Sequence, residues 1–473
     1  MNDIIKKSEN INRREFIKRM GVGVAAVTAT TLPGCTEKSG PSGYNTKQGE
    51  VPTDKMTYRT NPKTGEKVSL LGYGCMRWPT IPTADGSEEV IDQEEVNKLV
   101  DYALGHGVNY FDTAPPYLKG QSEHATGIAL SRHPRNSYFI ATKISNQAFA
   151  GQGLSPQEMY KKSVEMYRNS LKELQTDYID YYLLHVVGLG GGISALNERF
   201  FNSGVLDFLF KEREAGRIRN LGFSYHGDIK AFDYMLSRHD EFKWDFVQIQ
   251  LNYVDYRHAT EGNYNADYLY DELAKRNIPV VVMEPLLGGR LASLTKFLNS
   301  RLQERAPRKS IASWAFRFAG SFPKVLTVLS GMTYMEHLQD NIRTYSPLVE
   351  CSAEELDLLE NTAQIMLNYP SVPCTRCQYC MPCPYGIDIP TIFAHYNKCI
   401  NEGDAPAATQ DPDYRRARRA FLIGYDRAVP GLRQANHCIG CYQCAPHCPQ
   451  SINIPQELHR IDDFVEKLKQ NKL

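Results

Sequence analysis

Val108-Asn-Tyr-Phe-Asp112 is a short, largely apolar run, and Ser122 to Ser131 follows it with the apolar spacing of a helix. A short run that is rich in aromatic and β-branched side chains is typical of a buried β-strand. Buried strands that alternate with amphipathic helices predict a parallel sheet whose faces are covered by helices. This segment shows the pattern of the whole middle of the chain.

The same unit recurs eight times between Val68 and Ile342. The predicted strands are Val68 to Gly72, Val108 to Asp112, Tyr138 to Lys143, Ile179 to His185, Ile218 to Phe223, Phe246 to Leu251, Pro279 to Met283 and Val325 to Leu329. The predicted helices lie near Glu94 to Gly105, Ser122 to Ser131, Ser155 to Leu174, Gly204 to Ala215, Ile229 to His239, Asn265 to Arg276, Lys309 to Phe318 and Met335 to Arg343. Eight such units predict an α/β fold, a closed (β/α)8 TIM barrel. No G-x-G-x-x-G motif follows a strand, which disfavours an open dinucleotide-binding sheet.

The chain is long enough for a second, smaller domain, because 473 residues exceed one ordinary core. Its 54 basic and 54 acidic residues cancel, and this balance argues against nucleic-acid binding. We predict a signal peptide over residues 1–35, a flexible linker over 36–54, the barrel over 55–350 and a small, mainly α-helical domain over 351–473.

The N-terminal segment has the features of an export signal. Asn12-Arg13-Arg14-Glu15-Phe16-Ile17-Lys18 precedes an apolar stretch, Met20 to Leu32, that is shorter than the roughly 20 residues of a membrane-spanning helix. The arginine pair resembles a twin-arginine signal, and Leu32-Pro33-Gly34-Cys35 resembles a lipobox in which Cys35 would be lipidated. We therefore predict export to the periplasmic side, with a lipid anchor as the only link to a membrane. An unmodified Cys35 and a cytoplasmic protein are the alternatives.

Eight cysteines lie in two runs near the C-terminus. The runs are Cys374-x2-Cys377-x2-Cys380-x2-Cys383-Pro and Cys438-x2-Cys441-x2-Cys444-x3-Cys448-Pro. The second run has the spacing of bacterial ferredoxins, in which three cysteines bind one [4Fe-4S] cluster and the fourth binds the other. We therefore predict a ferredoxin-like domain with two [4Fe-4S] clusters, in which Cys448 joins the first three cysteines of the first run and Cys383 joins those of the second.

Zinc and disulfide bonds are the alternatives for these cysteines. Structural zinc takes two C-x2-C pairs, which leaves the third cysteine of each run unused. Disulfides between residues three apart on a tight loop have poor geometry. Clusters are inserted in the cytosol, so the protein would have to be exported already folded, as the twin-arginine machinery does. The basic patch Arg415 to Arg419, between the runs, is interpreted as a solvated helix face, with docking of an acidic redox partner as the alternative.

Four polar residues fall at or just after the ends of consecutive predicted strands: Asp112, Tyr117, Lys143 and His185. The carboxyl ends of barrel strands carry the chemistry in this fold. Carbonyl reduction needs a proton donor, and free tyrosine is a weak acid with a pKa near 10. A neighbouring lysine would lower that pKa, an aspartate would hold the lysine, and a histidine would orient the substrate oxygen.

The motifs around these residues are similar to those of the aldo/keto reductases, in particular the branch with an iron-sulfur C-terminal domain. They are Asn109-Tyr-Phe-Asp-Thr-Ala-Pro-Pro-Tyr117, Ile140-Ala-Thr-Lys143, Asp180-Tyr-Tyr-Leu-Leu-His185, Gly222-Phe-Ser-Tyr-His226 and Leu329-Ser-Gly-Met-Thr333. The resemblance implies that Tyr117 is the general acid, that Lys143 and Asp112 tune it, and that His185 orients the carbonyl.

The resemblance also implies NAD(P)H at the barrel mouth. Ser224 and Gln248 would contact the carboxamide, and Glu284 and Pro285 to Gly289, with Gly288, would form the loop beneath the pyrophosphate. The residues Ser330, Gly331, Thr333, Glu336 and Asn341 would hold the adenosine end. No Lys or Arg lies in Thr333 to Gln339 to grip a 2'-phosphate, so the choice between NAD and NADP stays open.

Together these features predict an exported oxidoreductase that acts on a small carbonyl or alcohol and exchanges electrons through two clusters, with a redox partner protein or a quinone-linked donor. The sequence leaves one step unexplained, because hydride carries two electrons and clusters transfer one at a time. The alternative is an electron-transfer partner whose barrel is a non-catalytic scaffold.

Overall fold

The computed structural model describes residues 50–85, 88–149, 152–260 and 262–473. The chain divides into two units, Met1–Ser42 and Gly43–Leu473, and the described residues belong to the second. The predicted twin-arginine motif, the lipobox with Cys35 and most of the linker lie outside the described residues. Within the described ranges, no helix combines the length and the apolar character needed to cross a membrane.

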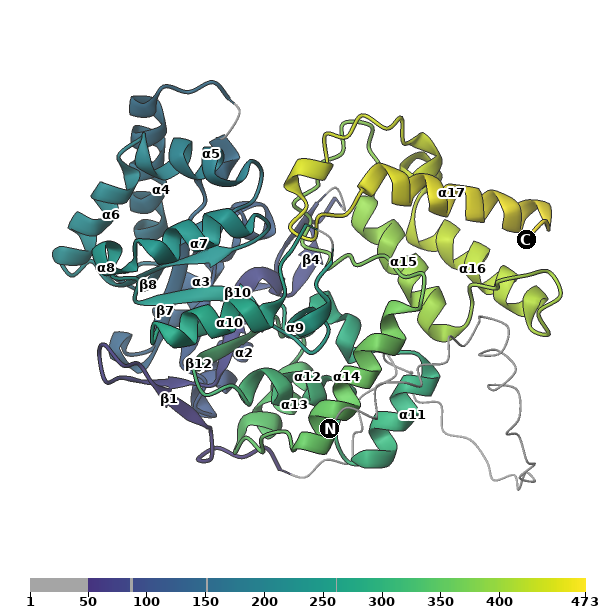
Figure 1. The fold of residues 1–473 in the computed structure, drawn as a ribbon, viewed down its shortest axis with the longest axis horizontal. Coiled ribbons are helices and arrows are strands. Elements are labelled where there is room, and N and C mark those ends of the chain that lie inside the picture. Colours follow the sequence, from purple (N-terminus) through teal and green to yellow (C-terminus); the bar gives the residue numbers. More distant parts are fainter. Residues whose placement is uncertain (1–49, 86–87, 150–151, 261) are drawn as a thin grey trace, which may run out of the picture. The chain divides into compact units, whose positions relative to one another are not determined.

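Eight parallel strands close into a barrel in the order β10, β11, β12, β3, β6, β7, β8, β9 (Figure 1). The barrel strands are β3 Leu71–Gly74, β6 Tyr110–Asp112, β7 Phe139–Ile144, β8 Ile179–Val187, β9 Ile218–Tyr225, β10 Phe246–Gln250, β11 Val280–Met283 and β12 Val325–Ser330. Two hairpins lie outside it, β1 Tyr58–Thr60 with β2 Lys67–Ser69, and β4 Thr80–Pro82 with β5 Glu89–Ile91. The predicted fold class is confirmed.

Helices follow the barrel strands in the predicted alternation. Those after the eight strands are α2 Gln93–Gly105, α3 Ser122–Leu130, α4 Pro156–Glu173, α6 Val205–Glu214, α7 Ile229–Ser237, α10 Ala266–Lys275, α12 Ile311–Gly320 and α13 Met335–Tyr345. Shorter or additional helices are α5 Gly192–Leu196, α8 His239–Phe242, α9 Asp255–His258 and α11 Lys296–Arg305. One boundary differs from the prediction: the run Val68 to Gly72 is divided, because β2 ends at Ser69 in a hairpin and the barrel strand begins at Leu71.

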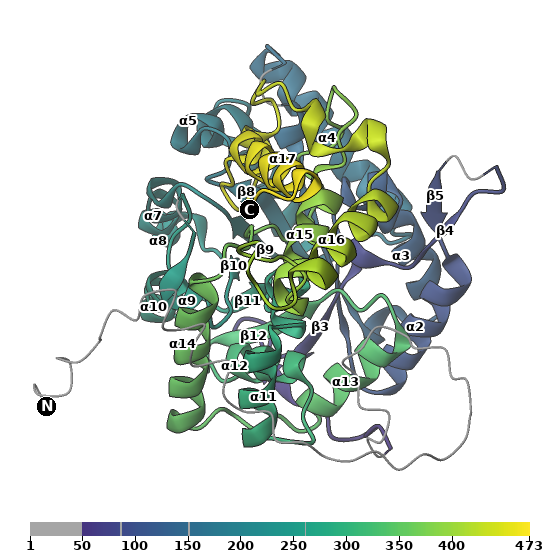
Figure 2. The same ribbon diagram turned by 90° about the vertical axis from the view of Figure 1, so that its right-hand side faces the viewer.

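The C-terminal residues form a second hydrophobic core. Helix α14, Ala353–Leu367, buries Leu359 and Ala363 in the core of the barrel. Helices α15 Ile389–Glu402, α16 Tyr414–Ala428 and α17 Ile454–Gln470 pack beside one another around a separate core (Figures 1 and 2). Several cysteines of the two runs contact this separate core.

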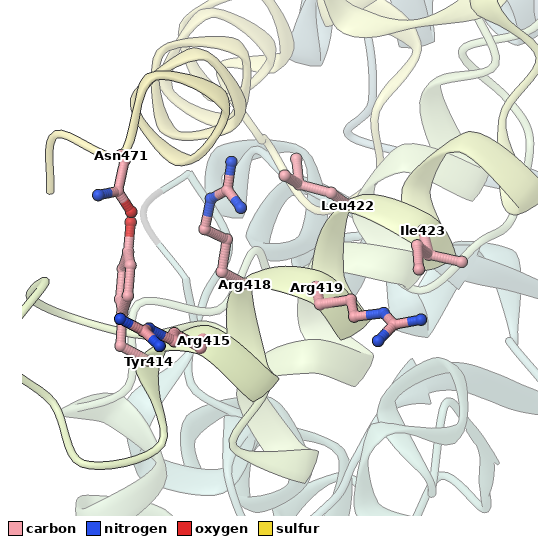
Figure 3. Close-up of a pocket in the computed structure, with 7 residues that line it drawn as sticks. All are labelled: Tyr414, Arg415, Arg418, Arg419, Leu422, Ile423 and Asn471. Atoms are coloured by element: carbon pink, nitrogen blue, oxygen red, sulfur yellow. The ribbon is translucent and has the colours of Figure 1, made fainter.

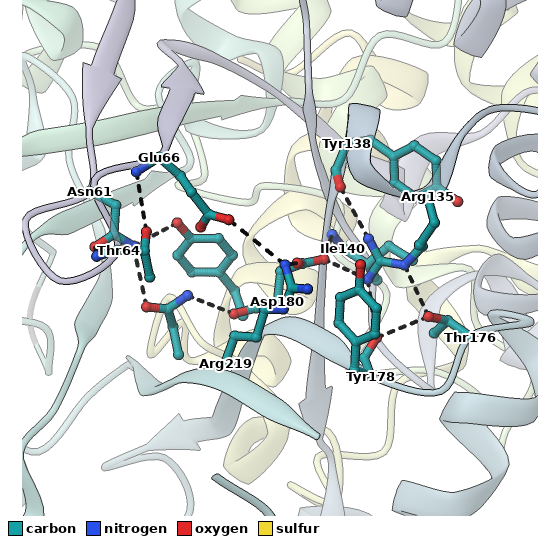
Figure 4. Close-up of polar contacts among 12 residues, drawn as sticks. Asn61, Thr64, Glu66, Arg135, Tyr138, Ile140, Thr176, Tyr178, Asp180 and Arg219 are labelled. Atoms are coloured by element: carbon teal, nitrogen blue, oxygen red, sulfur yellow. Dashed lines mark hydrogen bonds and ion pairs between the residues drawn. The ribbon is translucent and has the colours of Figure 1, made fainter. Parts of the chain in front are cut away.

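A buried carboxylate joins the amino ends of the barrel strands. Asp180, at the start of β8, accepts hydrogen bonds from Arg135 at 2.6 Å, from Arg219 at 3.2 Å and from the backbone N–H of Ile140 at 2.9 Å (Figure 4). Its side chain is only 2% exposed. A buried charge stabilises a fold only when its partners are in place. These contacts connect β7, β8 and β9 at the end of the barrel opposite the predicted site.

We expect Asp180→Asn to lower the free energy of unfolding by about 3 kcal/mol, because it removes the charge of a buried carboxylate to which two arginines and a backbone N–H are bonded. Chemical denaturation followed by far-UV circular dichroism measures this. Glu66→Gln is the matched control, since Glu66 meets Arg219 at 3.7 Å with a third of its side chain exposed, and we expect a loss below about 1 kcal/mol. Equal losses in the two variants would contradict this role of Asp180.

Candidate active site

The four predicted catalytic residues come together at the carboxyl ends of the strands, and we call Asp112, Tyr117, Lys143 and His185 the tetrad. Asp112 ends β6, Lys143 lies near the end of β7 and His185 near the end of β8. Tyr117 begins a short 3-10 turn, Tyr117–Gly120, that follows β6. The rings of Tyr117 and His185 are 6.1 Å apart between centroids, in an edge arrangement. Neighbouring parallel strands therefore place the four side chains around one point.

Lys143 is held by a buried ion pair. Its Nζ donates to Asp112 Oδ1 at 2.6 Å and to the Thr113 carbonyl at 2.7 Å, and the side chains of the pair are 1% and 4% exposed. The ammonium lies 4.9 Å from the centroid of the Tyr117 ring. Desolvating such a pair is costly unless the geometry is good, so the pair fixes one positive charge beside the phenol.

The predicted lowering of the Tyr117 pKa is wrong for this arrangement. Burial raises the pKa of Tyr117 well above its ordinary value, and the Asp112 carboxylate raises it further. The physical reason is that burial removes the phenolate from water, and the nearby Asp112 carboxylate counteracts the lysine charge that was expected to favour it. Tyr117 therefore keeps its proton until a more basic oxygen forms next to it.

The hydrogen bonds of His185 determine which of its nitrogens carries the proton. Arg199 donates to Gln147 Oε1 at 3.4 Å, which turns the amide nitrogen of Gln147 toward His185 Nδ1 at 3.3 Å. An amide nitrogen only donates, so Nδ1 is an acceptor, and the Ser145 hydroxyl, 2.7 Å from the same nitrogen, can then donate to it as well. Burial, then the charge of Lys143, lowers the pKa of His185 well below its ordinary value, so the ring is neutral. The proton is therefore on Nε2, the nitrogen on the other side of the ring.

Arg199 is a functional residue that the sequence did not reveal. It is buried, and it donates to the backbone carbonyl of His185, to that of Val186 at 3.3 Å and to Asn146 Oδ1 at 3.0 Å. Val186 has a φ of 51°, an outlier for a β-branched residue. Arg199 thus supports a strained turn directly after His185. Its position on a π-helical turn, Asn197–Phe201, gave no sequence signal.

Tyr379, from the first cysteine run, covers the tetrad. Its hydroxyl lies 3.3 Å from His185 Nε2 and is hydrogen-bonded to Tyr117. These are the two groups expected to bind the substrate oxygen. The sequence gave no hint of this contact, because Tyr379 lies between two predicted cluster ligands and 194 residues after His185.

The residues predicted to hold the nicotinamide end are buried. The Ser224 hydroxyl accepts a hydrogen bond from the backbone N–H of Val186 at 2.9 Å. Gln248 is 2% exposed, and its Oε1 has no partner among the described residues. One acceptor is thus free at this position.

The loop predicted to lie beneath the pyrophosphate is covered by the cysteine domain. A Cβ atom on Gly288 would lie 2.3 Å from Thr375 Cα, so the two backbones are in direct contact. The backbone N–H of Gly288 donates to Glu284 Oε2 at 2.5 Å. Pro285 is buried, whereas Gly289 is exposed with open space beside it. The loop packs against protein where the prediction places phosphate.

Most of the residues predicted for the adenosine end also contact other residues of the protein. A Cβ atom on Gly331 would lie 3.0 Å from Arg77 Cδ, and Thr333 Oγ1 donates to the Arg77 carbonyl at 2.9 Å. The buried side chains of Asn341 and Ser330 bond each other, Nδ2 to Oγ, at 3.0 Å. Glu336 alone in this group has an exposed side chain.

The cysteines of the two runs divide into two groups. Cys374, Cys377, Cys380 and Cys448 line one cavity together with apolar residues of α15 and α17. Cys383, Cys438 and Cys441 lie close enough to Cys444 to interact with it electrostatically. All described cysteines are free thiols, and no three His, Cys, Asp or Glu side chains in the described ranges converge on a single metal ion. A cavity lined by four thiols and a second group of four neighbouring thiols fit the donor chemistry of [4Fe-4S] clusters.

A second hollow lies between α16 and the end of α17 (Figure 3). It is lined by Tyr414, Arg415, Arg418, Arg419, Leu422, Ile423 and Asn471. Arg415 and Arg419 are exposed, and Arg418 Nη2 donates to the Lys469 carbonyl at 3.1 Å. The basic patch is therefore largely a solvated helix face with one arginine that caps the C-terminal helix.

Comparisons with known proteins agree with these features. Residues 70–362 match the aldo/keto reductase family, and residues 373–454 match the 4Fe-4S dicluster domain. "Uncharacterized oxidoreductase YqkF" of Bacillus subtilis is 25% identical, over 58% of this chain and 87% of its own length. L-galactose dehydrogenase of Arabidopsis thaliana is 24% identical over 65% and 93%. An aldo-keto reductase from Bacillus halodurans, solved in its holo form, is 23% identical over 65% and 96% with a TM-score of 0.49.

We expect His185 to make the stability of the protein depend on pH. The unfolded chain binds a proton at this histidine near pH 6.5, and the folded chain does not, so the free energy of unfolding falls as the pH drops below that value. His185→Gln lacks this contribution. The stability difference between wild type and variant should therefore shrink between about pH 7.5 and about pH 5.5 in urea unfolding. A difference that stays constant would contradict a neutral, buried His185.

Proposed function

Because the chain belongs to the aldo/keto reductase family and carries a C-terminal 4Fe-4S dicluster domain, we propose that it interconverts a small carbonyl and its alcohol, with Tyr117 as the general acid and base. The observation that carries this proposal is the convergence of the Tyr117 hydroxyl and His185 Nε2 on one polar atom, at present the hydroxyl of Tyr379. A substrate oxygen that replaces this hydroxyl meets the same two groups.

In the direction of reduction, Tyr117 donates its proton to the oxygen as negative charge develops there. The raised pKa suits a donor that waits for a strongly basic oxygen. The Lys143 ammonium, fixed by Asp112, stabilises the phenolate that remains. His185 donates from Nε2 to the same oxygen and holds it in place.

The tetrad supports an enzyme more than a scaffold. A scaffold that only docks an electron carrier has no use for a desolvated Lys143–Asp112 pair, whose burial carries an energetic penalty. Nor does it need a buried Arg199 to orient a neutral histidine. Such arrangements are typical of catalytic sites, where charge is held in place before the reaction.

We propose that the cysteine domain binds two [4Fe-4S] clusters, which supply one-electron transfer when bound. The grouping of the thiols supports a crossed arrangement in which Cys448 completes the set of Cys374, Cys377 and Cys380. A redox partner protein or a quinone-linked donor would then be the electron source. Cluster binding and the Arg13-Arg14 pair also support export in the folded state, with Cys35 as the lipid attachment point.

Tyr117→Phe tests the catalytic assignment. We expect turnover of a carbonyl substrate by the anaerobically purified protein to fall by about 10²–10⁴-fold, because the variant has no proton to donate. Turnover is measured by product analysis, once with reduced methyl viologen and once with NADPH as the reductant. Tyr160→Phe, which changes an exposed tyrosine on helix α4, is the control. Full turnover in Tyr117→Phe with either reductant would refute the assignment.

Paired cysteine variants test the crossed arrangement. We expect about eight iron atoms per chain in the wild type and about four in Cys448→Ser. Cys374→Ser combined with Cys448→Ser should lose no more iron than either change alone, because both remove the same cluster. Cys441→Ser combined with Cys448→Ser should leave about none. Iron and sulfide analysis after anaerobic purification gives the result, and additive losses in the first pair would contradict the grouping.

A further inference from the structure

We infer that the barrel takes no nicotinamide nucleotide, because residues 374–380 of the chain's own cysteine domain occupy the place that the family pattern gives to that cofactor. The inference rests on the proposed function and names the electron source for the same site. It is carried by three contacts between this segment and the barrel mouth.

The first contact is at the predicted pyrophosphate loop. Thr375 is 1% exposed, and its Cα lies where even a methyl group on Gly288 would collide with it. A pyrophosphate is far larger than a methyl group, so it cannot lie on this loop while the segment is in place.

The second contact fixes the segment from the other side. Arg77 Nη2 donates to the Thr375 carbonyl at 2.7 Å. The Arg77 side chain also packs on Gly331, and the backbone carbonyl of Arg77 accepts a hydrogen bond from Thr333 Oγ1. Arg77, a cation that could neutralise a phosphate here, is thus bound to the segment, and it covers the predicted adenosine end as well.

The third contact is at the tetrad. The Tyr379 hydroxyl bonds His185 Nε2 and Tyr117, so the segment reaches from the predicted pyrophosphate loop to the catalytic tyrosine within five residues. A nicotinamide ring in the usual place would have to share this space. The free Oε1 of Gln248 is one acceptor for a carboxamide, but a single acceptor does not hold a dinucleotide.

Without a hydride donor, the electrons come from a one-electron carrier. Reduction of the carbonyl breaks the C=O π bond and takes two electrons and two protons: the carrier supplies the electrons in two transfers, Tyr117 donates one proton to oxygen, and water supplies the other to carbon. The first electron transfer turns the carbonyl into a radical. This radical is low enough in energy to form only when conjugation delocalises its unpaired electron. The substrate class is therefore a carbonyl conjugated to double bonds, whose oxygen displaces the hydroxyl of Tyr379.

Equilibrium dialysis of the anaerobically purified, cluster-loaded protein against NADH and NADPH tests the inference. We expect no binding of either nucleotide with a Kd below about 1 mM, the upper end of ordinary Michaelis constants. We also expect reduced methyl viologen to support reduction of cinnamaldehyde, and not of a saturated aldehyde of similar size. Stoichiometric binding of NADH or NADPH would overturn the inference.

Gly288→Ala tests whether residues 374–380 must pack on Gly288, with Gly289→Ala as the matched control. Both glycines have left-handed backbones, with φ of 68° and 96°, but only Gly288 has the segment against it. Gly288→Ala should lose the iron of the first cluster, about four atoms per chain, and Gly289→Ala should keep it. Equal iron content in the two folded variants would contradict the role of this packing contact between Thr375 and Gly288. If Gly288→Ala fails to fold by far-UV circular dichroism, dialysis of the wild type decides.

The outcomes separate this inference from the proposed function. Nucleotide binding together with a large loss of turnover in Tyr117→Phe would overturn the inference and leave the proposed chemistry standing. Turnover with methyl viologen that is insensitive to Tyr117→Phe would do the reverse.

Discussion

The buried pair of Lys143 and Asp112 is the interaction on which the site depends. It joins the carboxyl ends of two neighbouring barrel strands, and its bond to the Thr113 carbonyl fixes the turn that leads to Tyr117. Because both charges are removed from water, neither can leave without leaving the other unpaired. The pair therefore keeps the phenol in position and holds a positive charge beside it.

The cysteine domain is part of the active site as much as an electron carrier attached to it. Tyr379 lies over the tetrad and Thr375 over the loop after β11, so the segment that would bind the first cluster is also a wall of the barrel mouth. Electron transfer through a protein weakens with distance. A cluster bound within this wall would be close to the reacting atoms, and that proximity addresses the step that the sequence left unexplained.

The sequence predicted the barrel well because its signal is local and repeated. Each strand and helix has its own periodicity, and the ends of three consecutive strands placed Asp112, Tyr117, Lys143 and His185 together. The run at Val68 was misread because a hairpin strand and a barrel strand adjoin there, and both are apolar. Arg199 and Tyr379 could not be predicted, since their roles come from contacts far along the chain. The pKa of Tyr117 depends on burial, which no motif encodes.

Gly288 shows that a glycine can indicate a close neighbour without identifying it. A glycine in a loop at a barrel mouth indicates that something approaches the backbone closely. In a nucleotide-binding protein that neighbour is a phosphate, and here it is another stretch of main chain. A second domain of the same chain can thus occupy the place that the family pattern gives to a diffusible cofactor, while the surrounding residues still match that pattern.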